Sequence, residues 1–219
     1  MLKKVDSSHD FQNYFGISRP EMTDFVPRDA QKILEVGCGI GGFAKIIKES
    51  RNCEYWAIEP YKEAAQSAGK IVDKIIISGF DECYHELPKN YFDCVIFNDV
   101  LEHISNPFDT LEKLHKILPD GAKIVSSLPN VRYVKNMFDL IIKRDWEYLH
   151  EGGILDFTHL RFFTQKSIIR MFESSGYKII SIQGINPIAK KISFLLFNIM
   201  TFGLFSDGKY LQYAVVAEK

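Results

Sequence analysis

Three glycines at the end of a short apolar run are the first residues in this sequence whose types and spacing favour ligand chemistry. Gly37, Gly39 and Gly42 follow the apolar run 32–36 and precede apolar residues at helical spacing. Glycine between a strand and a helix permits positive φ and lets a ligand approach the backbone closely. The spacing also satisfies GxGxxG, so it predicts a nucleotide-like ligand and leaves a dinucleotide such as NAD open.

Two carboxylates flank this glycine turn. Glu35 lies just before Gly37, and Glu59 follows the apolar run 53–58. A carboxylate at the end of a second strand can accept hydrogen bonds from both hydroxyl groups of a ribose. Glu35 would repel a pyrophosphate in a partly dry site, but it would suit the ammonium group of a methionine moiety. The pair therefore favours a positively charged sulfur nucleoside over NAD.

Strands and helices must alternate to bring these residues together. Apolar runs of strand length occur at 32–36, 53–58, 74–77, 92–97 and 122–126. Helical spacing follows the first, second and fourth runs, and Asn106 with Pro107 predicts a helix start. The connection at 81–87 has no clear pattern. The alternation predicts a doubly wound α/β fold with a mostly parallel sheet and helices on both faces.

The second half of the chain completes this plan. Residues 130–163 are irregular and rich in aromatic side chains, and we interpret them as an insertion that covers the active site. Thr164 predicts the cap of a further helix, and 177–182 and 211–217 are expected to be a closing pair of strands. We expect residues 1–219 to form a single domain, with ligands bound beyond the carboxyl ends of the strands.

Composition excludes several other classes of protein. The formal net charge is −1, which gives no electrostatic reason to expect nucleic acid or an anionic membrane as partner. The four cysteines form no CxxC pair, and no histidine cluster stands near them at zinc-ligand spacing, so we expect no metal and a reducing compartment. The first residues contain no apolar signal segment, so we expect the cytoplasm.

The most apolar stretch of the chain is 192–205, ISFLLFNIMTFGLF. It is shorter than the ~20 residues that span a bilayer. We interpret it as a buried helix or the wall of a hydrophobic pocket. A surface that contacts a lipid-linked substrate or a partner subunit is the alternative.

Three segments resemble the motifs of class I S-adenosylmethionine (SAM)-dependent methyltransferases. They are LEVGCGIGG (34–42), AIEP (57–60) and FDCVIFNDVLEHISNP (92–107). The resemblance implies the Rossmann-like methyltransferase fold, with seven strands and an antiparallel strand at the C-terminus. It also implies SAM as cofactor and S-adenosylhomocysteine as product. The implied cofactor contacts are Glu35, Gly37, Cys38, Gly39, Glu59, Pro60, Asn98 and Val100.

The sequence departs from this family after the third predicted strand. Relatives commonly have Gly-Asp there, with the acid hydrogen-bonded to the adenine amine, whereas this chain has Gly79-Phe80-Asp81-Glu82. We predict that Phe80 stacks on the adenine and that Asp81 takes the hydrogen-bonding role.

Further segments resemble one bacterial subgroup of these enzymes. They are SRPEM, SSLPNVRY, DWEY, GILDFTHLRFF and LQYAVVA, which together extend over nearly the whole chain. The subgroup is found beside or fused to glycosyltransferases of surface-polysaccharide synthesis. The resemblance implies a sugar hydroxyl as acceptor and a homodimer or a glycosyltransferase partner. A small-molecule oxygen or nitrogen acceptor, an NAD-linked oxidoreductase and a non-catalytic binding module remain alternatives.

Two histidines are the candidates for acting on the acceptor. His103 follows the fourth predicted strand and is a candidate general base or positioning group, with a satisfied, partly buried histidine as the alternative. His159 is suited to accept a hydroxyl proton, and Arg161 to hold a phosphate or carboxylate. An extended backbone would place His159 with Arg161, and a helix would place it with Asp156. A structural network that fixes the insertion is the other interpretation.

Overall fold

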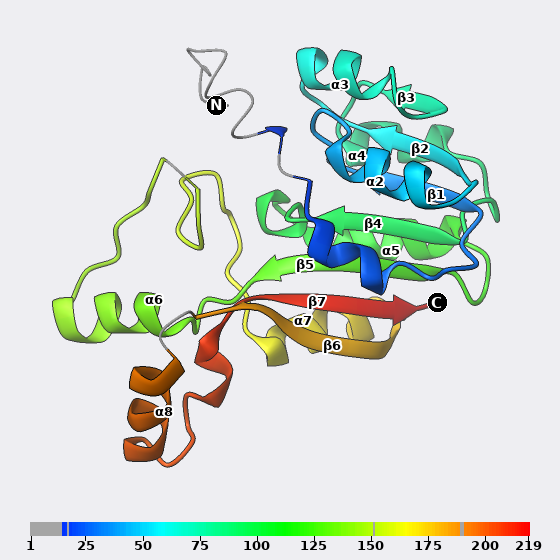
Figure 1. The fold of residues 1–219 in the computed structure, drawn as a ribbon. Helices are drawn as coiled ribbons and strands as arrows, with labels where there is room; N and C mark the ends of the chain where they lie inside the picture. The colour runs from blue at the N-terminus through cyan, green and yellow to red at the C-terminus, as the bar shows by residue number, and fades with distance from the viewer. Residues whose placement is uncertain (1–14, 17, 151, 189–190) are drawn as a thin grey trace.

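The described part of the chain forms one seven-stranded sheet (Figure 1). The computed structural model describes residues 15–16, 18–150, 152–188 and 191–219. The strand order is β3-β2-β1-β4-β5-β7-β6, and the strands up to β5 pair in parallel. The strands are β1 (Lys32–Val36), β2 (Glu54–Ile58), β3 (Lys74–Ile76), β4 (Cys94–Asn98), β5 (Lys123–Pro129), β6 (Lys178–Pro187) and β7 (Tyr210–Glu218).

The predicted fold class is confirmed. From β1 the chain winds outward to β3, then returns to place β4 on the other side of β1, so the winding direction reverses between β1 and β4. β7 pairs antiparallel with both β5 and β6. The crevice beyond the ends of β1 and β4 is where an open α/β sheet binds its ligand.

Helices cover both faces of the sheet. On one face η1 (Pro20–Phe25), α2 (Gly42–Ser50) and α3 (Lys62–Ala68) pack around Met22, Phe43 and Ala68. On the other face lie α4 (Phe80–Cys83), η2 (Tyr84–Glu86), α5 (Pro107–Ile117) and α7 (Gln165–Ser174). The connection at 81–87, for which the sequence showed no clear pattern, is therefore made by two short helical segments, α4 and η2.

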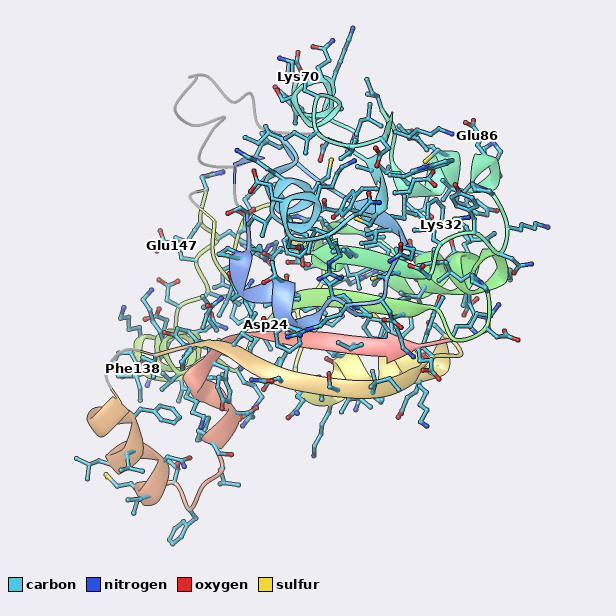
Figure 2. The ribbon with its side chains drawn as sticks, turned by 45° about the vertical axis from the view of Figure 1, so that its right-hand side comes forward. Asp24, Lys32, Lys70, Glu86, Phe138 and Glu147 are labelled. Carbon is cyan, nitrogen blue, oxygen red and sulfur yellow. The ribbon has the colours of Figure 1, made fainter. Side chains whose placement is uncertain are left out.

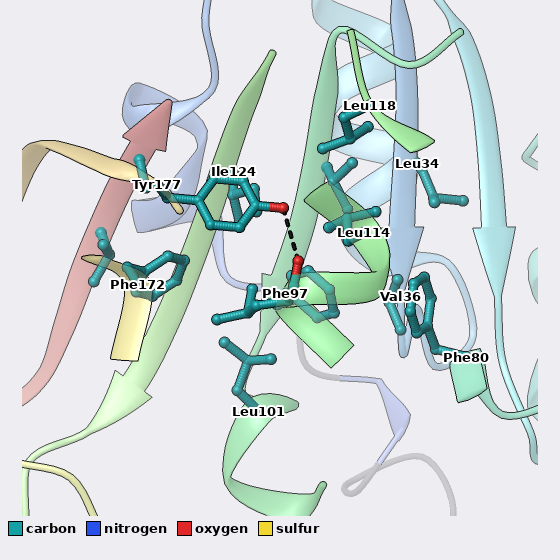
Figure 3. Close-up of a cluster of buried hydrophobic side chains, with 14 of the residues drawn as sticks. Leu34, Val36, Phe80, Phe97, Leu101, Leu114, Leu118, Ile124, Phe172 and Tyr177 are labelled. Atoms are coloured by element: carbon teal, nitrogen blue, oxygen red, sulfur yellow. Dashed lines mark hydrogen bonds between the residues drawn. The ribbon is translucent and has the colours of Figure 1, made fainter. Parts of the chain in front are cut away.

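The second face holds the larger hydrophobic core (Figure 3). Phe97 of β4, Leu114 of α5 and Phe172 of α7 are fully or nearly fully buried there. The Tyr177 hydroxyl donates a hydrogen bond to the Leu111 carbonyl oxygen across 3.0 Å, which joins the end of α7 to α5. Because each central strand is covered on both faces, its apolar residues run without alternation.

Local capping chemistry explains where two helices begin. The Asn106 side chain accepts a hydrogen bond from the Asp109 N–H, and Pro107 takes the first helical position of α5. Thr164 and Ser167 form a reciprocal capping box at the start of α7. Both helix starts agree with the sequence-based predictions.

The segment between β5 and α7 lies beyond the ends of β4 and β5 (Figure 1). It contains α6 (Val134–Phe138), the π-helical turn η4 (Asp139–Lys143) and an irregular stretch. A bridge between Asn130 and Phe163 closes its base. Residues 156–161 are neither extended nor helical, because the Asp156 carboxylate accepts the Thr158 N–H and makes a tight turn. A regular strand or helix, on which the two predicted side-chain pairings depended, is therefore absent from this stretch.

The apolar stretch 192–205 is not the buried helix that we expected. It forms α8 (Lys191–Met200) and a series of turns, followed by η5 (Ser206–Lys209). Ile199 is 63% exposed and Phe202 is 95% exposed. Figure 1 shows α8 standing away from the sheet, and Figure 2 shows the exposed Phe138 of α6 at the same end of the molecule. Among the described residues, no helix is both long and apolar enough to cross a bilayer.

Candidate cofactor and acceptor site

The glycine turn after β1 needs glycine for its backbone and for its contacts. Gly37 and Gly39 have φ of 74° and 55°, in the left-handed region that other residues avoid. A Cβ on Gly37 would lie 2.5 Å from Cγ2 of Val100. The backbone of the turn therefore lies directly against the residue that follows β4 and Asp99. This contact brings the two predicted halves of the cofactor site together.

Glu35 is a buried carboxyl group at the end of β1. It is 2% exposed, and its Oε2 accepts a hydrogen bond from the Tyr55 hydroxyl at 2.9 Å. Burial, with a smaller contribution from the nearby Glu59, raises the pKa of Glu35 to about 8 against the opposing effect of the Tyr55 hydrogen bond. Neutral Glu35 thus predominates near pH 7, and a cation placed beside it would favour the charged form.

Glu59 ends β2 and is bound to the glycine turn itself. Its Oε2 accepts the Gly39 N–H and its Oε1 accepts the Tyr61 N–H, both at 2.9 Å. Burial raises the pKa of Glu59, while these two backbone hydrogen bonds lower it. Each carboxylate oxygen retains a further lone pair for a ligand hydroxyl. The sequence predicted Glu59 as a ligand contact but not as the residue that shapes the turn.

The remaining predicted cofactor contacts differ in their surroundings. Cys38 is buried, and burial raises the pKa of its thiol, so the group is a neutral part of the turn. Pro60 is exposed. Both polar atoms of the Asn98 amide are buried, and neither has a hydrogen-bond partner in the described part of the chain. A buried amide without partners is a ready binding group for a polar ligand.

Phe80 and Asp81 have partners that the sequence did not predict. Phe80 is 5% exposed and packs edge-to-face on Phe97 in the core. The Asp81 carboxylate accepts a hydrogen bond from the Lys113 ammonium group at 2.9 Å. The structure therefore gives Phe80 a packing role and directs Asp81 toward α5, and their adenine contacts stay predictions.

A polar network at the end of β4 was missed by sequence reasoning. Asp99 has a positive φ of 54°, and its Oδ1 accepts hydrogen bonds from Ser127 Oγ at 2.9 Å and Gln212 Nε2 at 2.6 Å. Arg19 pairs with the same carboxylate and donates to Gln212 Oε1. Arg19 and Gln212 lie within the quoted segments SRPEM and LQYAVVA, but nothing in those segments indicates that they meet.

Phe15, which precedes η1, also contacts the glycine turn. The carbonyl oxygen of Phe15 accepts the Ile40 N–H at 3.1 Å, and a Cβ on Gly39 would lie 2.5 Å from that oxygen. The Phe15 ring stacks on Tyr61 with centroids 4.7 Å apart. Phe15 is thus a further residue of this site that the sequence did not indicate.

The two candidate catalytic histidines lie side by side. His103 ends η3 (Leu101–His103), the short helix after β4, and its ring centroid is 4.7 Å from that of His159. His159 Nδ1 lies 2.8 Å from the Ile154 carbonyl oxygen, and His103 Nδ1 lies 3.2 Å from that of Thr158. Burial and the neighbouring His159 lower the pKa of His103. The sequence predicted each histidine separately but could not predict their contact.

Glu102 completes this histidine pair. Its Oε1 lies 4.0 Å from His159 Nε2, and its side chain is fully buried. The described part of the chain offers no hydrogen-bond partner to either of its carboxylate oxygens. Burial raises the pKa of Glu102 well above its ordinary value, and Asp99 adds to this.

Backbone hydrogen bonds tie the insertion to η3. The N–H groups of Leu160 and Arg161 both donate to the Glu102 carbonyl oxygen, at 2.8 and 3.0 Å. The Arg161 guanidinium donates to the Ser105 carbonyl oxygen at 3.1 Å. Asp156 and Arg161 therefore both form hydrogen bonds within the protein, as expected if they belong to a structural network that fixes the insertion.

Comparison with known proteins agrees with this geometry. Residues 14–182 match the family model described as methyltransferase domain. The ubiquinone biosynthesis O-methyltransferase of Azoarcus sp. (strain BH72) is 25% identical over an alignment of 169 residues that covers 73% of this chain and 70% of that protein.

Two solved structures share the fold. A SAM-dependent methyltransferase from Archaeoglobus fulgidus has a TM-score of 0.73 at 18% identity, covering 98% of this chain and 100% of that one. The plantazolicin methyltransferase BpumL, in complex with SAH, has a TM-score of 0.61 at 15% identity, covering 95% and 81%.

The fold and the family match together define the class of this protein. The chain belongs to the methyltransferase domain family and is a class I SAM-dependent methyltransferase. Membership of this family decides against the NAD-linked oxidoreductase that the GxGxxG spacing had left open.

Proposed function

We propose that this enzyme methylates a hydroxyl oxygen, and that the acceptor is a sugar or glycan precursor. The observation that carries the proposal is the pair His103 and His159 beside Glu102, held next to the glycine turn through the contact of Val100 with Gly37. Unprotonated imidazole is suited to accept a hydroxyl proton. The sugar is supported by the resemblance of GILDFTHLRFF (153–163) to the polysaccharide-associated subgroup.

The residues around the turn fit SAM. The glycine turn lies between Glu35 and Glu59: the desolvated Glu35 suits the ammonium group, and Glu59, which accepts the Gly39 N–H, suits the ribose hydroxyls. The Asn98 amide, which has no hydrogen-bond partner among the described residues, suits the methionine end. When bound, SAM supplies an electrophilic methyl group on a positively charged sulfur.

The protein positions the acceptor for this transfer. We assign to the insertion 130–163 the role of covering the acceptor, because its residues 160 and 161 hydrogen-bond to η3 beside the histidines. Correct alignment of two reactants lowers the activation barrier by roughly 7–11 kcal/mol. A general base accelerates the reaction by a further ~10²–10⁴-fold. His103 or His159 is the proposed base.

A small-molecule oxygen is the second candidate acceptor. It is favoured by the similarity to an O-methyltransferase whose name refers to ubiquinone biosynthesis. Both candidate acceptors are methylated on oxygen, and they differ in the size and shape of the molecule that the insertion must enclose.

The experiment has a binding stage and a transfer stage. Calorimetry with SAM and with SAH should show one site per chain, and NADH should give no heat. Transfer of a labelled methyl group should then be measured to nucleotide-linked sugars, lipid-linked glycan precursors and small phenols. Label in a sugar supports the proposal, whereas label only in phenols supports the second candidate. SAM binding without transfer to any oxygen acceptor would contradict both.

One variant tests the proposed role of the histidines. His159→Ala should reduce turnover more than it reduces SAM affinity, because the residue acts on the acceptor side. Equal turnover with the identified acceptor would make His159 structural. His115→Ala is not a suitable control because its ring packs on Gly176, whereas the exposed His85→Ala is.

A further inference from the structure

We propose that Glu102, His103 and His159 bind one divalent transition-metal ion beside the glycine turn. One ligand-type atom from each of the three side chains lies within 4.8 Å of the others. The spacing along the sequence gave no reason to expect a metal, because His159 is far from the other two residues in the chain. The fold brings the insertion against η3 and so creates the cluster.

The hydrogen bonds of both histidines leave a nitrogen lone pair for a metal. A carbonyl oxygen only accepts, so Nδ1 of His159 carries the proton that it donates to Ile154 O at 2.8 Å. His103 Nδ1 faces Thr158 O and Thr158 Oγ1, and that hydroxyl already donates its proton to Asp156. Nε2 is therefore the unprotonated nitrogen in both neutral rings. Metal-binding histidines characteristically donate their other N–H to such a backbone carbonyl.

The Glu102 carboxylate is only weakly compensated by the described residues, because burial outweighs the attraction of Arg19. Its two oxygens are buried, and neither accepts a hydrogen bond from the described residues. An ionised carboxylate in such a place is strongly destabilising unless a cation or hydrogen-bond donors face it. Among the described residues, Arg19 attracts Glu102 from beyond ion-pair distance, and His159 Nε2 lies 4.0 Å from Glu102 Oε1, beyond hydrogen-bonding distance. A metal ion between these two atoms would satisfy both.

The donor set indicates which metals fit. Two imidazoles and one carboxylate form the protein part of catalytic zinc sites, which keep a fourth position open, and of some iron(II) sites. Mg²⁺ and Ca²⁺ prefer oxygen ligands alone. Metal bonds of about 2.1 Å place neighbouring ligand atoms about 3–3.5 Å apart. The present separations of up to 4.8 Å require only a small closing movement of the side chains.

The consequence for catalysis rests on the proposed function. An open metal position would hold the acceptor hydroxyl and lower its pKa, so that the proton passes to solvent. The acceptor oxygen then bonds to the methyl carbon as the carbon–sulfur bond breaks, and the electron pair stays on the sulfur of S-adenosylhomocysteine. His103 and His159 would then act as metal ligands rather than as bases.

The test measures metal binding directly. Chelator-treated protein without a histidine tag should bind one Zn²⁺ per chain in calorimetry, and Co²⁺ should give d–d absorption bands of a nitrogen–oxygen site. Zn²⁺ affinity should fall at least tenfold in Glu102→Gln and in His159→Ala. The matched control is His85→Gln, since His85 is an exposed histidine 3.8 Å from a glutamate, Glu86, and its affinity should be unchanged.

Two results would overturn the inference. One is chelator-treated wild-type protein that binds no Zn²⁺, or that loses its Zn²⁺ binding in His85→Gln. The other is Glu102→Gln that folds, as judged by its circular dichroism and melting curve, and binds Zn²⁺ as tightly as wild type. The second result would mean that a proton, rather than a metal, neutralises Glu102.

SAM binding is measured in the same samples to separate this inference from the proposed function. We expect chelator-treated protein to retain SAM affinity, because no cofactor contact named above belongs to the metal cluster. SAM binding without a metal site overturns the metal inference alone. A metal site in a protein that does not bind SAM overturns the proposed function instead.

Discussion

The Glu59 carboxylate accepts a hydrogen bond from the backbone N–H of Gly39 across 2.9 Å, which joins the end of β2 to the glycine turn after β1. Its second oxygen accepts the Tyr61 N–H at the start of α3. One acid therefore holds together the glycine turn and the start of α3, beside the proposed ribose site. Its removal should affect both folding and cofactor binding.

Glu59→Ala should weaken SAM binding by at least tenfold and lower the free energy of unfolding by about 1–3 kcal/mol. Both effects arise because the N–H groups of Gly39 and Tyr61 lose their acceptor and the proposed ribose loses its own. Calorimetry and urea denaturation measure the two effects. The exposed Glu63→Ala on α3 is the control. Unchanged SAM affinity would refute the ribose role.

Glu35 should make the stability of the ligand-free protein depend on pH. Its pKa is about 8 in the fold and 4.5 ordinarily, so the folded state holds one more proton between these values. The stability that this proton contributes is fully present below pH 4.5 and is lost as pH rises through about 8. The loss is of the order of 4–5 kcal/mol. Denaturation at pH 5, 7 and 9 should show a smaller decline in Glu35→Gln than in wild type.

The same carboxyl should link SAM binding to protons. A bound ammonium group favours ionised Glu35, so binding below pH 8 should release a proton and SAM affinity should increase from pH 6 to 8. Calorimetry in buffers of different ionisation enthalpy counts the released protons. Binding to Glu35→Gln should still show any change in the protonation of SAM itself, but the proton that Glu35 releases should be lost from the count. An equal proton count in both proteins would place the ammonium group elsewhere.

Gly37→Ala should destabilise the protein through two separable effects. The new Cβ meets Val100 Cγ2 at 2.5 Å, and φ is 74°. Gly121→Ala is the matched control, because Gly121 has φ of 82° but nothing within 4 Å of the added Cβ. We expect Gly121→Ala to cost about 1 kcal/mol and Gly37→Ala about 1–3 kcal/mol more. Gly37→Ala with Val100→Ala should recover part of that difference, and no recovery would contradict the contact argument.

The exposed apolar side chains of α8 should promote self-association. Leu196 and Ile199 are 59% and 63% exposed, and residues 192–205 contain no charged side chain. Apolar surface of this kind favours contact between copies. Leu196→Glu with Ile199→Glu should reduce association in sedimentation velocity, whereas Ile77→Glu, at a residue 49% exposed beyond β3, should not. A wild-type protein that remains monomeric at every concentration would contradict the prediction.

The features that could be predicted from the sequence are those that neighbouring residues encode. Apolar runs and helical spacing predicted the order of elements, and Asn106 and Thr164 predicted helix starts, because capping and amphipathic patterns act within one or two turns. Positive φ at Gly37 and Gly39 follows from glycine in a tight turn. These local rules, together with parallel-sheet topology, were enough to predict the class of fold.

Tertiary structure alone decided which distant side chains meet. Glu102 and His159 come together because the insertion hydrogen-bonds back onto η3, and Arg19 meets Asp99 because η1 and β7 lie beside the end of β4. Burial of the apolar stretch 192–205 also could not be judged from its composition. Hydrophobicity measures the free energy gained by leaving water, whereas the packing of the whole chain determines which surfaces find a partner.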